Sequence, residues 1–143
     1  MRPLGVFLAS ADKAELAALR LLFKQLEDVC VVGAANDTHG VLSLILNSGA
    51  DFLLLDWELP VQSDLSSQNG EGEPELAVPD LIAILNLAIE NLHTIVLSID
   101  LQIETVALAA GADDFVCKSS PPERMLAALV REIRNQQMNL FHA

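Results

Sequence analysis

The sequence is short of aromatic and basic residues, and both shortages narrow what the protein can be. Aromatic residues make up 4% of its 143 positions while hydrophobic residues make up 52%, so the core must consist mainly of Leu, Ile, Val and Ala. Eight residues are Lys or Arg against 20 that are Asp or Glu, which gives a formal net charge of −12. Because phosphate backbones are bound by clustered Lys and Arg, this charge disfavours direct nucleic acid binding by this segment.

Cysteines and long apolar runs are scarce as well. Cys30 and Cys117 have neither CxxC spacing nor the pattern of a disulfide framework, and we expect them to be small apolar residues in strands of a cytoplasmic protein. The apolar region at 81–99 is interrupted by polar residues, so no membrane span is expected. Residues 4–11 follow Arg2 as in a signal peptide, but they are equally compatible with a buried strand.

Sequence motifs of common enzyme sites are missing. The chain has no Gly-rich dinucleotide loop, no GxxxxGK[ST] phosphate loop and no GxSxG nucleophile turn. His39, His93 and His142 lack metal-ligand spacing. A cofactor- or ligand-binding enzyme therefore stays an alternative only because the fold predicted below hosts many functions.

Short apolar runs alternate with segments of helical periodicity along the chain. The runs predict buried strands at 4–9, 29–35, 52–55, 94–98 and 115–118. The intervening segments predict helices at about 13–27, from 38 to Gly49, from Pro79 to 89, at 102–110 and after 120. Five strands, each followed by a helix, predict an α/β fold: a doubly wound parallel sheet covered on both faces, in one domain spanning 1–143.

The predicted helix boundaries carry familiar end signals. Two pairs of residues have the spacing of a capping box, in which each side chain satisfies a free amide of the first turn. Glycine follows two of the apolar stripes, where a left-handed residue can end a helix. These signals predict helix starts at Asp12 with Glu15 and at Ser120 with Glu123, and helix ends at Gly49 and Gly111.

One segment breaks the alternation. Residues 61–78 are rich in Ser, Gly and Pro and contain four acidic residues. A loop of this length is uncommon in a compact domain and is usually functional or disordered. We expect an acidic, solvated loop rather than a functional lid. Residues 134–143 are expected to form a C-terminal tail.

Polar side chains stand where the predicted strands end. Ser10 follows the first strand, Asp56 the third, and Ser98 and Lys118 end the fourth and fifth. Ligands bind beyond the carboxyl ends of strands in such sheets, so these side chains are expected to face one pocket. A carboxylate and an ammonium buried there should form a pair.

Several motifs are found together in the expected order. They are Phe52-Leu53-Leu54-Leu55-Asp56 with Leu59-Pro60, Ile95-Val96-Leu97-Ser98, and Gly111-Ala112-Asp113-Asp114-Phe115-Val116-Cys117-Lys118. With these motifs the sequence resembles the receiver domain of bacterial response regulators in two-component signalling, over essentially the whole chain except 61–78. The run at 118–123 is similar to the corresponding run in receivers that are fused to helix-turn-helix output domains. The resemblance implies the flavodoxin-like, (βα)5 receiver fold and a signalling role rather than metabolic turnover.

The resemblance also implies roles for four residues. Asp56 would accept a phosphoryl group from a sensor histidine kinase, and Lys118 would stabilise the transferring group. Ser98 would hydrogen-bond the phosphoryl oxygens, and Phe115 would repack as the switch aromatic. Each residue also has a purely structural alternative: a satisfied carboxylate, a salt-bridge partner, a hydroxyl bonded to the backbone and a core ring.

The sequence departs from the receiver pattern at one point. Ser10 and Ala11 occupy the positions of the two acids that hold Mg²⁺ in this family. Asp12 follows one place later, where a helix cap is the favoured role. With Asp56 as the one assured carboxylate, and Glu58 as a weak second ligand, Mg²⁺ binding should be greatly weakened or absent. We therefore expect an atypical receiver with weak or no Mg²⁺-dependent phosphorylation at Asp56.

Two further alternatives remain open. One is a conventional receiver whose metal site is restored by Glu58 or Asp12. The other is a structural adaptor that forms a homodimer through the fourth helix, fifth strand and fifth helix, a stretch that includes apolar Leu101, Ile103 and Val106.

Overall fold

The computed structural model of the chain describes residues 3–61, 75–120, 124 and 127–131. The strands and helices follow one another in the alternating order that the sequence predicts. They are β1 (Leu4–Ala9), α1 (Lys13–Lys24), β2 (Val29–Ala35), α2 (Thr38–Ile45), β3 (Phe52–Asp56), α3 (Val78–Ala88), β4 (His93–Ser98), α4 (Ile103–Ala110) and β5 (Asp114–Cys117). Residues 124 and 127–131 are also helical, in the region of the predicted last helix.

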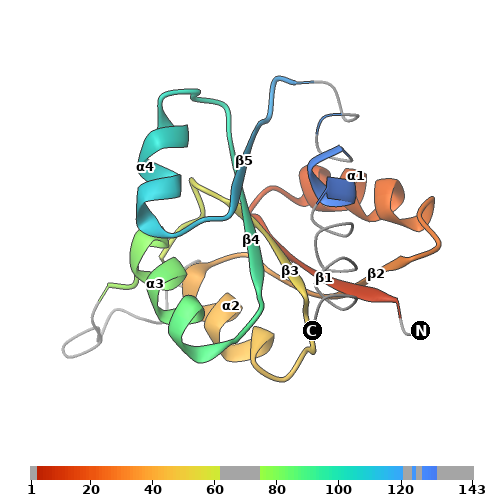
Figure 1. Cartoon of the computed structure of the whole chain (residues 1–143), viewed down its shortest axis with the longest axis horizontal. Helices are drawn as coiled ribbons and strands as arrows, with labels where there is room; N and C mark the ends of the chain where they lie inside the picture. Colours follow the sequence, from red (N-terminus) through yellow and green to blue (C-terminus); the bar gives the residue numbers. More distant parts are fainter. Residues whose placement is uncertain (1–2, 62–74, 121–123, 125–126, 132–143) are drawn as a thin grey trace.

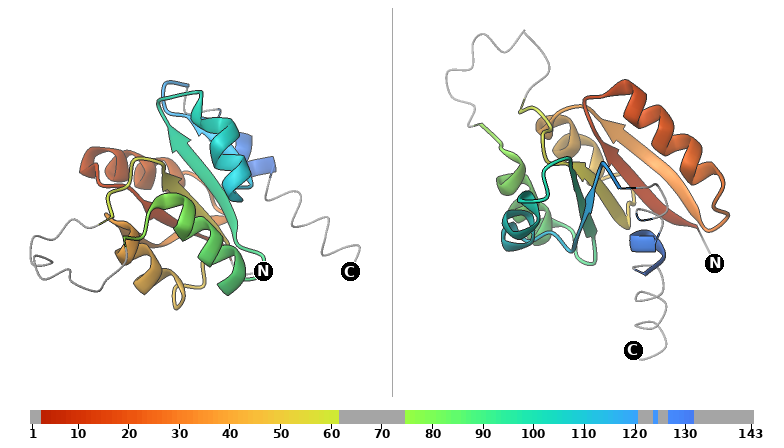
Figure 2. Two further views of the ribbon diagram at one scale, coloured as in Figure 1. Left: turned by 90° about the vertical axis from the view of Figure 1, so that its left-hand side faces the viewer. Right: turned by 90° about the horizontal axis from the view of Figure 1, so that it is seen from above.

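The strands form one parallel sheet with the order β2-β1-β3-β4-β5 (Figure 1). The order reverses between β1 and β3, as in a doubly wound sheet. Helix α1 and the segment 127–131 lie on one face, and α2, α3 and α4 lie on the other (Figure 2). The predicted α/β class and the covered parallel sheet are confirmed.

The sheet separates two apolar cores. Phe7 and Leu53 point into the core under α2, α3 and α4, whereas Val6 and Leu54 point into the core that α1 covers. Successive residues of a strand face opposite sides, so a strand buried on both faces needs apolar residues at every position. This explains why the central strands appear in the sequence as unbroken apolar runs.

The start of α1 confirms one half of its predicted capping box and corrects the other. The Asp12 carboxylate accepts the backbone N–H groups of Ala14 and Glu15, at 2.9 and 3.2 Å, which makes it the N-cap. The expected return bond from Glu15 to the Asp12 N–H is wrong, because that N–H donates to Ser10 Oγ at 3.1 Å. The Glu15 side chain is turned toward other partners instead.

Some predicted boundaries shift by a few residues. Helix α1 ends at Lys24 rather than at 27, and α2 ends at Ile45, with Gly49 in the turn that follows at a φ of 73°. The predicted end of α4 at Gly111 is confirmed: this residue has a φ of 116°, and its N–H donates to the carbonyl of Leu108.

Other predictions fall partly or wholly beyond the described residues. These are most of the 61–78 loop, the tail at 134–143 and the cap of the last helix at Glu123. Cys30 lies in β2 and Cys117 in β5, and both are free thiols, as expected. No helix in the described part of the chain is long and apolar enough to cross a bilayer.

Candidate functional site

The carboxyl ends of β3 and β5 bring an acid and a base into direct contact. Asp56 is the last residue of β3, and Lys118 comes directly after β5. Lys118 Nζ lies 2.8 Å from Asp56 Oδ2. Because all strands of the sheet run in parallel, their carboxyl ends lie along the same edge (Figure 1). The expected pairing of Asp56 and Lys118 is therefore present.

Backbone contacts hold both residues in place. Asp56 is 6% exposed, and its Oδ1 accepts the N–H of Glu58 at 3.0 Å. The backbone N–H of Lys118 donates to the carbonyl of Ser98 at 2.9 Å, which ties the end of β5 to β4. Among the described residues, the carboxylate is thus fixed by a hydrogen bond to the Glu58 N–H and an ion pair with Lys118.

Glu15 is a site residue that the sequence did not reveal. Its Oε1 and Oε2 each lie 3.3 Å from Lys118 Nζ, although the two residues are 103 positions apart. In a βα unit the first turn of the helix lies near the carboxyl end of the preceding strand. The position of Glu15 in that turn of α1 could have indicated a site residue. The capping-box interpretation instead paired its side chain with the Asp12 N–H.

Ser10 fixes the orientation of Glu15. Its side chain is almost completely buried, with 1% of the residue exposed, and its Oγ donates to Glu15 Oε2 at 2.6 Å. The same oxygen accepts the N–H of Asp12 at 3.1 Å. Ser10 therefore links the end of β1 to the first turn of α1. Its neighbour Ala11 is exposed.

The charges of the site stabilise the protonated form of Lys118. Burial alone lowers the pKa of Lys118, but hydrogen bonding and charge from Asp56, followed by those from Glu15, outweigh it. The net result is a pKa of Lys118 raised above its ordinary value. The ammonium is therefore a fixed positive charge between two carboxylates at neutral pH.

Ser98 is hydrogen-bonded to Lys118 through the backbone, and Phe115 lies in β5, the strand that Lys118 follows. Ser98 is 1% exposed, and its Oγ accepts the N–H of Asp100 at 3.1 Å. Phe115 is 8% exposed and packs in the core under α3 and α4. These contacts agree with the structural alternatives for both residues. Their signalling roles stay predictions.

The arrangement does not fit a seated Mg²⁺ ion. Asp12 is exposed and caps α1, and Glu58 is exposed while its backbone N–H contacts Asp56. Across the described ranges, no cluster of three or more His, Cys, Asp or Glu residues could hold a metal. An ion between Asp56 and Glu15 would have to displace the ammonium of Lys118, which contacts both.

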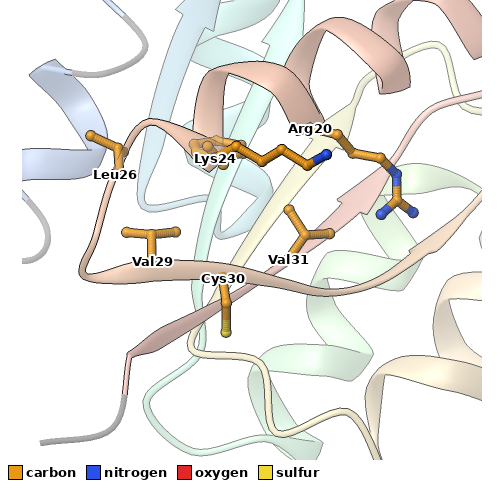
Figure 3. A pocket seen from close by; sticks show the side chains of 7 residues that line it. Arg20, Lys24, Leu26, Val29, Cys30 and Val31 are labelled. Carbon is orange, nitrogen blue, oxygen red and sulfur yellow. The ribbon is translucent and has the colours of Figure 1, made fainter.

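Two hollows lie outside this site. One, of about 410 Å³, lies between the second half of α1 and edge strand β2, with Arg20 and Lys24 above the strand (Figure 3). The other, of about 170 Å³, includes Phe115 and is bounded by residues of the α4–β5 region and by Arg124, Ala128 and Arg131. Neither is lined by Asp56, Lys118 or Glu15.

Comparison with known proteins gives structural rather than sequence similarity. No family model matches the chain, and no curated protein matches it in sequence. The isolated receiver (REC) domain of RcsB from Salmonella enterica serovar Typhimurium superposes with a TM-score of 0.71 at 23% identity, covering 91% of this chain and 90% of that one. A CheY-like receiver domain from Methanospirillum hungatei JF-1 gives 0.73 at 18% identity, covering 96% and 98%.

A longer RcsB chain from the same Salmonella serovar is also similar. In its complex with the P1flhDC promoter it gives a TM-score of 0.77 at 21% identity, over 94% of this chain. The present chain spans 62% of that RcsB chain. The chain therefore has the CheY-like, flavodoxin-type fold of response regulator receiver domains, as the sequence resemblance implied.

Proposed function

We propose that this chain is an atypical receiver domain of a two-component phosphorelay, in which Asp56 is the phosphoryl acceptor. The observation that carries the proposal is the contact between Asp56 and Lys118 at the carboxyl edge of a receiver-type sheet. A carboxylate can act as a nucleophile toward a phosphoryl group when positive charge is fixed beside it. The role is signalling rather than turnover of metabolites.

The transfer itself needs few groups. The P–N bond to a kinase histidine breaks with its electron pair returning to the imidazole, and a P–O bond forms to an Asp56 oxygen. Charge on the transferring group would be balanced by Lys118, 2.8 Å from Asp56. Ser98 would then donate its hydroxyl to a phosphoryl oxygen after leaving the Asp100 N–H, and Phe115 would repack with it.

Metal dependence is where this chain would differ from other receivers. A bound Mg²⁺ would supply further positive charge to the phosphoryl oxygens. Here Lys118 lies between the two nearest carboxylates, so we propose that phosphotransfer is slow or absent and responds little to Mg²⁺.

The proposed partner is a sensor histidine kinase or another signalling protein, in the cytoplasm. The RcsB neighbours include chains solved with promoter DNA, but the charge of −12 makes direct DNA contact by this segment unfavourable. A homodimer through α4, β5 and the last helix is a second proposed interaction. Leu101 and Val106 are 67% and 51% exposed there, whereas Ile103 is half-buried.

The test is intact mass spectrometry after incubation with acetyl phosphate, with and without Mg²⁺. We expect a small or slowly formed phosphoryl adduct whose amount changes little with Mg²⁺ and which is lost in Asp56→Asn. Asp80→Asn, an exposed acid in the first turn of α3, is the matched control and should behave as wild type. A rapid adduct that requires Mg²⁺ would show a conventional receiver. An adduct that survives in Asp56→Asn would remove Asp56 as the acceptor.

A further inference from the structure

A continuous chain of polar contacts joins four elements at the carboxyl edge of the sheet. Ser10, after β1, contacts Glu15 of α1 at 2.6 Å, and Glu15 contacts Lys118, after β5, at 3.3 Å. Lys118 in turn contacts Asp56 of β3 at 2.8 Å. All four residues are buried or partly buried, so these contacts are better shielded from solvent than a surface ion pair.

Of the two groups that contact the Ser10 hydroxyl, only one can accept its proton. The Asp12 N–H is a donor and occupies a lone pair of Ser10 Oγ, whereas the ionised Glu15 carboxylate only accepts. The single hydroxyl proton must therefore point to Glu15. Because Ser10 is 1% exposed, water has little access to replace this bond. The Glu15 carboxylate is held by a buried donor as well as by the Lys118 ammonium.

Glu15 supplies more of the contacts to the Lys118 ammonium than Asp56 does. Three carboxylate oxygens, one from Asp56 and two from Glu15, lie within 3.3 Å of Lys118 Nζ. An ammonium carries three N–H groups and accepts nothing. These contacts to the ammonium therefore come from two acids, Asp56 and Glu15. Without Glu15, two of the three oxygens around the ammonium would be lost.

We propose that Glu15 is a positioning residue, oriented by Ser10, which holds the Lys118 ammonium against Asp56 at the place that a divalent ion would otherwise occupy. The negative charges of Asp56 and Glu15 are then balanced by Lys118 rather than by a bound ion. The consequence for phosphotransfer depends on the proposed receiver function, whereas the positioning role does not. Glu15 also places a second negative charge beside the acceptor, which opposes the arrival of a phosphoryl group.

Lysine NMR can test the positioning role directly, because the chain contains three lysines: Lys13, Lys24 and Lys118. Lysine labelled at Cε is titrated with pH in the full chain, and Lys118 is assigned by loss of its signal in Lys118→Met. In Glu15→Gln we expect the titration midpoint of Lys118 to move to lower pH. An unchanged Lys118 midpoint would overturn the proposal.

Three further variants separate contact from general charge. Glu15→Asp keeps the charge but shortens the side chain, so the Lys118 midpoint should again fall; a wild-type midpoint would show that the contact is unimportant. Ser10→Ala should move Lys118 in the same direction, because Glu15 loses its fixed donor, and no movement would remove Ser10 from the proposal. Glu27→Gln, an exposed acid beyond α1, removes the same charge and should leave Lys118 unchanged.

Phosphorylation in the same variants tests the consequence separately. In Glu15→Gln the rate of metal-free adduct formation from acetyl phosphate should rise about tenfold, because a like charge beside the acceptor is gone. A fall in this rate would contradict the opposing role of Glu15. If neither protein is phosphorylated while the Lys118 midpoint still falls, the acceptor role proposed for Asp56 fails and the positioning role stands. Mg²⁺ that shifts the wild-type Lys118 signal would show an ion displacing the ammonium, and would overturn the proposal.

Discussion

At the scale of single residues, Lys118 places one positive charge between two carboxylates. Its side chain is 20% exposed, and those of Asp56 and Glu15 are 9% and 18% exposed. Removing one member of a partly buried ion pair leaves the other charge without compensation. In Lys118→Met, two acids would face one another with no cation between them. The site should therefore contribute to folding stability.

We predict that Lys118→Met lowers the free energy of unfolding by about 2 kcal/mol at neutral pH, less than for a fully buried pair because solvent reaches the site. The pKa of Lys118 is raised on folding, so its contribution is complete below the unfolded value and is lost as pH rises through the higher folded value. The difference between wild type and variant should thus hold from about pH 7 to pH 10 and shrink above it.

Urea unfolding followed by the fluorescence of Trp57, the single tryptophan, provides the measurement. Lys24→Met, an exposed lysine at the end of α1, is the matched control and should show no such alkaline loss. A wild-type-minus-variant difference that grows at alkaline pH would contradict the ion pair as the source of the stability.

At the scale of elements, α1 connects the fold to the site. Its N-cap Asp12 satisfies two amides of the first turn, and Glu15 stands in that same turn. Loss of an N-cap side chain typically costs about 1 kcal/mol. Fraying of this turn would also loosen the Glu15 carboxylate from Lys118. The cap is therefore coupled to the site through less than one turn of helix.

We predict that Asp12→Ala lowers the free energy of unfolding by about 1 kcal/mol, and that Asp12→Asn retains at least about half of the cap's contribution, because both side chains accept from the same amides. Urea midpoints measure both effects. Asp12→Asn also tests the conventional-receiver alternative, in which Asp12 restores the metal site. A Trp57 fluorescence response to Mg²⁺ in wild type that disappears in Asp12→Asn would favour that alternative.

The same helix shows what could be predicted from the sequence and what could not. The strands and the Asp56–Lys118 pair were predictable, because apolar runs mark buried strands and parallel strands end at one edge. The role of Glu15 was not predictable, because spacing along a helix indicates only contacts between residues close in sequence, and Lys118 is 103 positions away. The prediction that Gly49 ends the second helix was wrong for a related reason. A glycine with a left-handed backbone fits a turn after α2 as well as a helix end.

At the scale of the whole molecule, net charge and exposed apolar residues act against each other. Two copies with a formal charge of −12 repel one another over a distance set by the ionic strength. Yet Leu101 and Val106 leave apolar surface open beside β5, and such surface favours association. Self-association through this face should therefore depend strongly on salt.

We predict that the dimer fraction rises between about 0.05 M and 0.5 M NaCl, because salt screens the repulsion while the apolar contact is retained. Val106→Glu should weaken association at least about tenfold, since it would bury an unpaired charge in the contact. Leu21→Glu, at a residue 64% exposed on α1, adds the same charge on another face and should weaken association far less.

Light scattering over a concentration series measures the association of wild type and of both variants. Equal weakening by both variants would assign the effect to net charge alone, and a monomer at every salt concentration would rule out both this dimer and a dimer-based adaptor role.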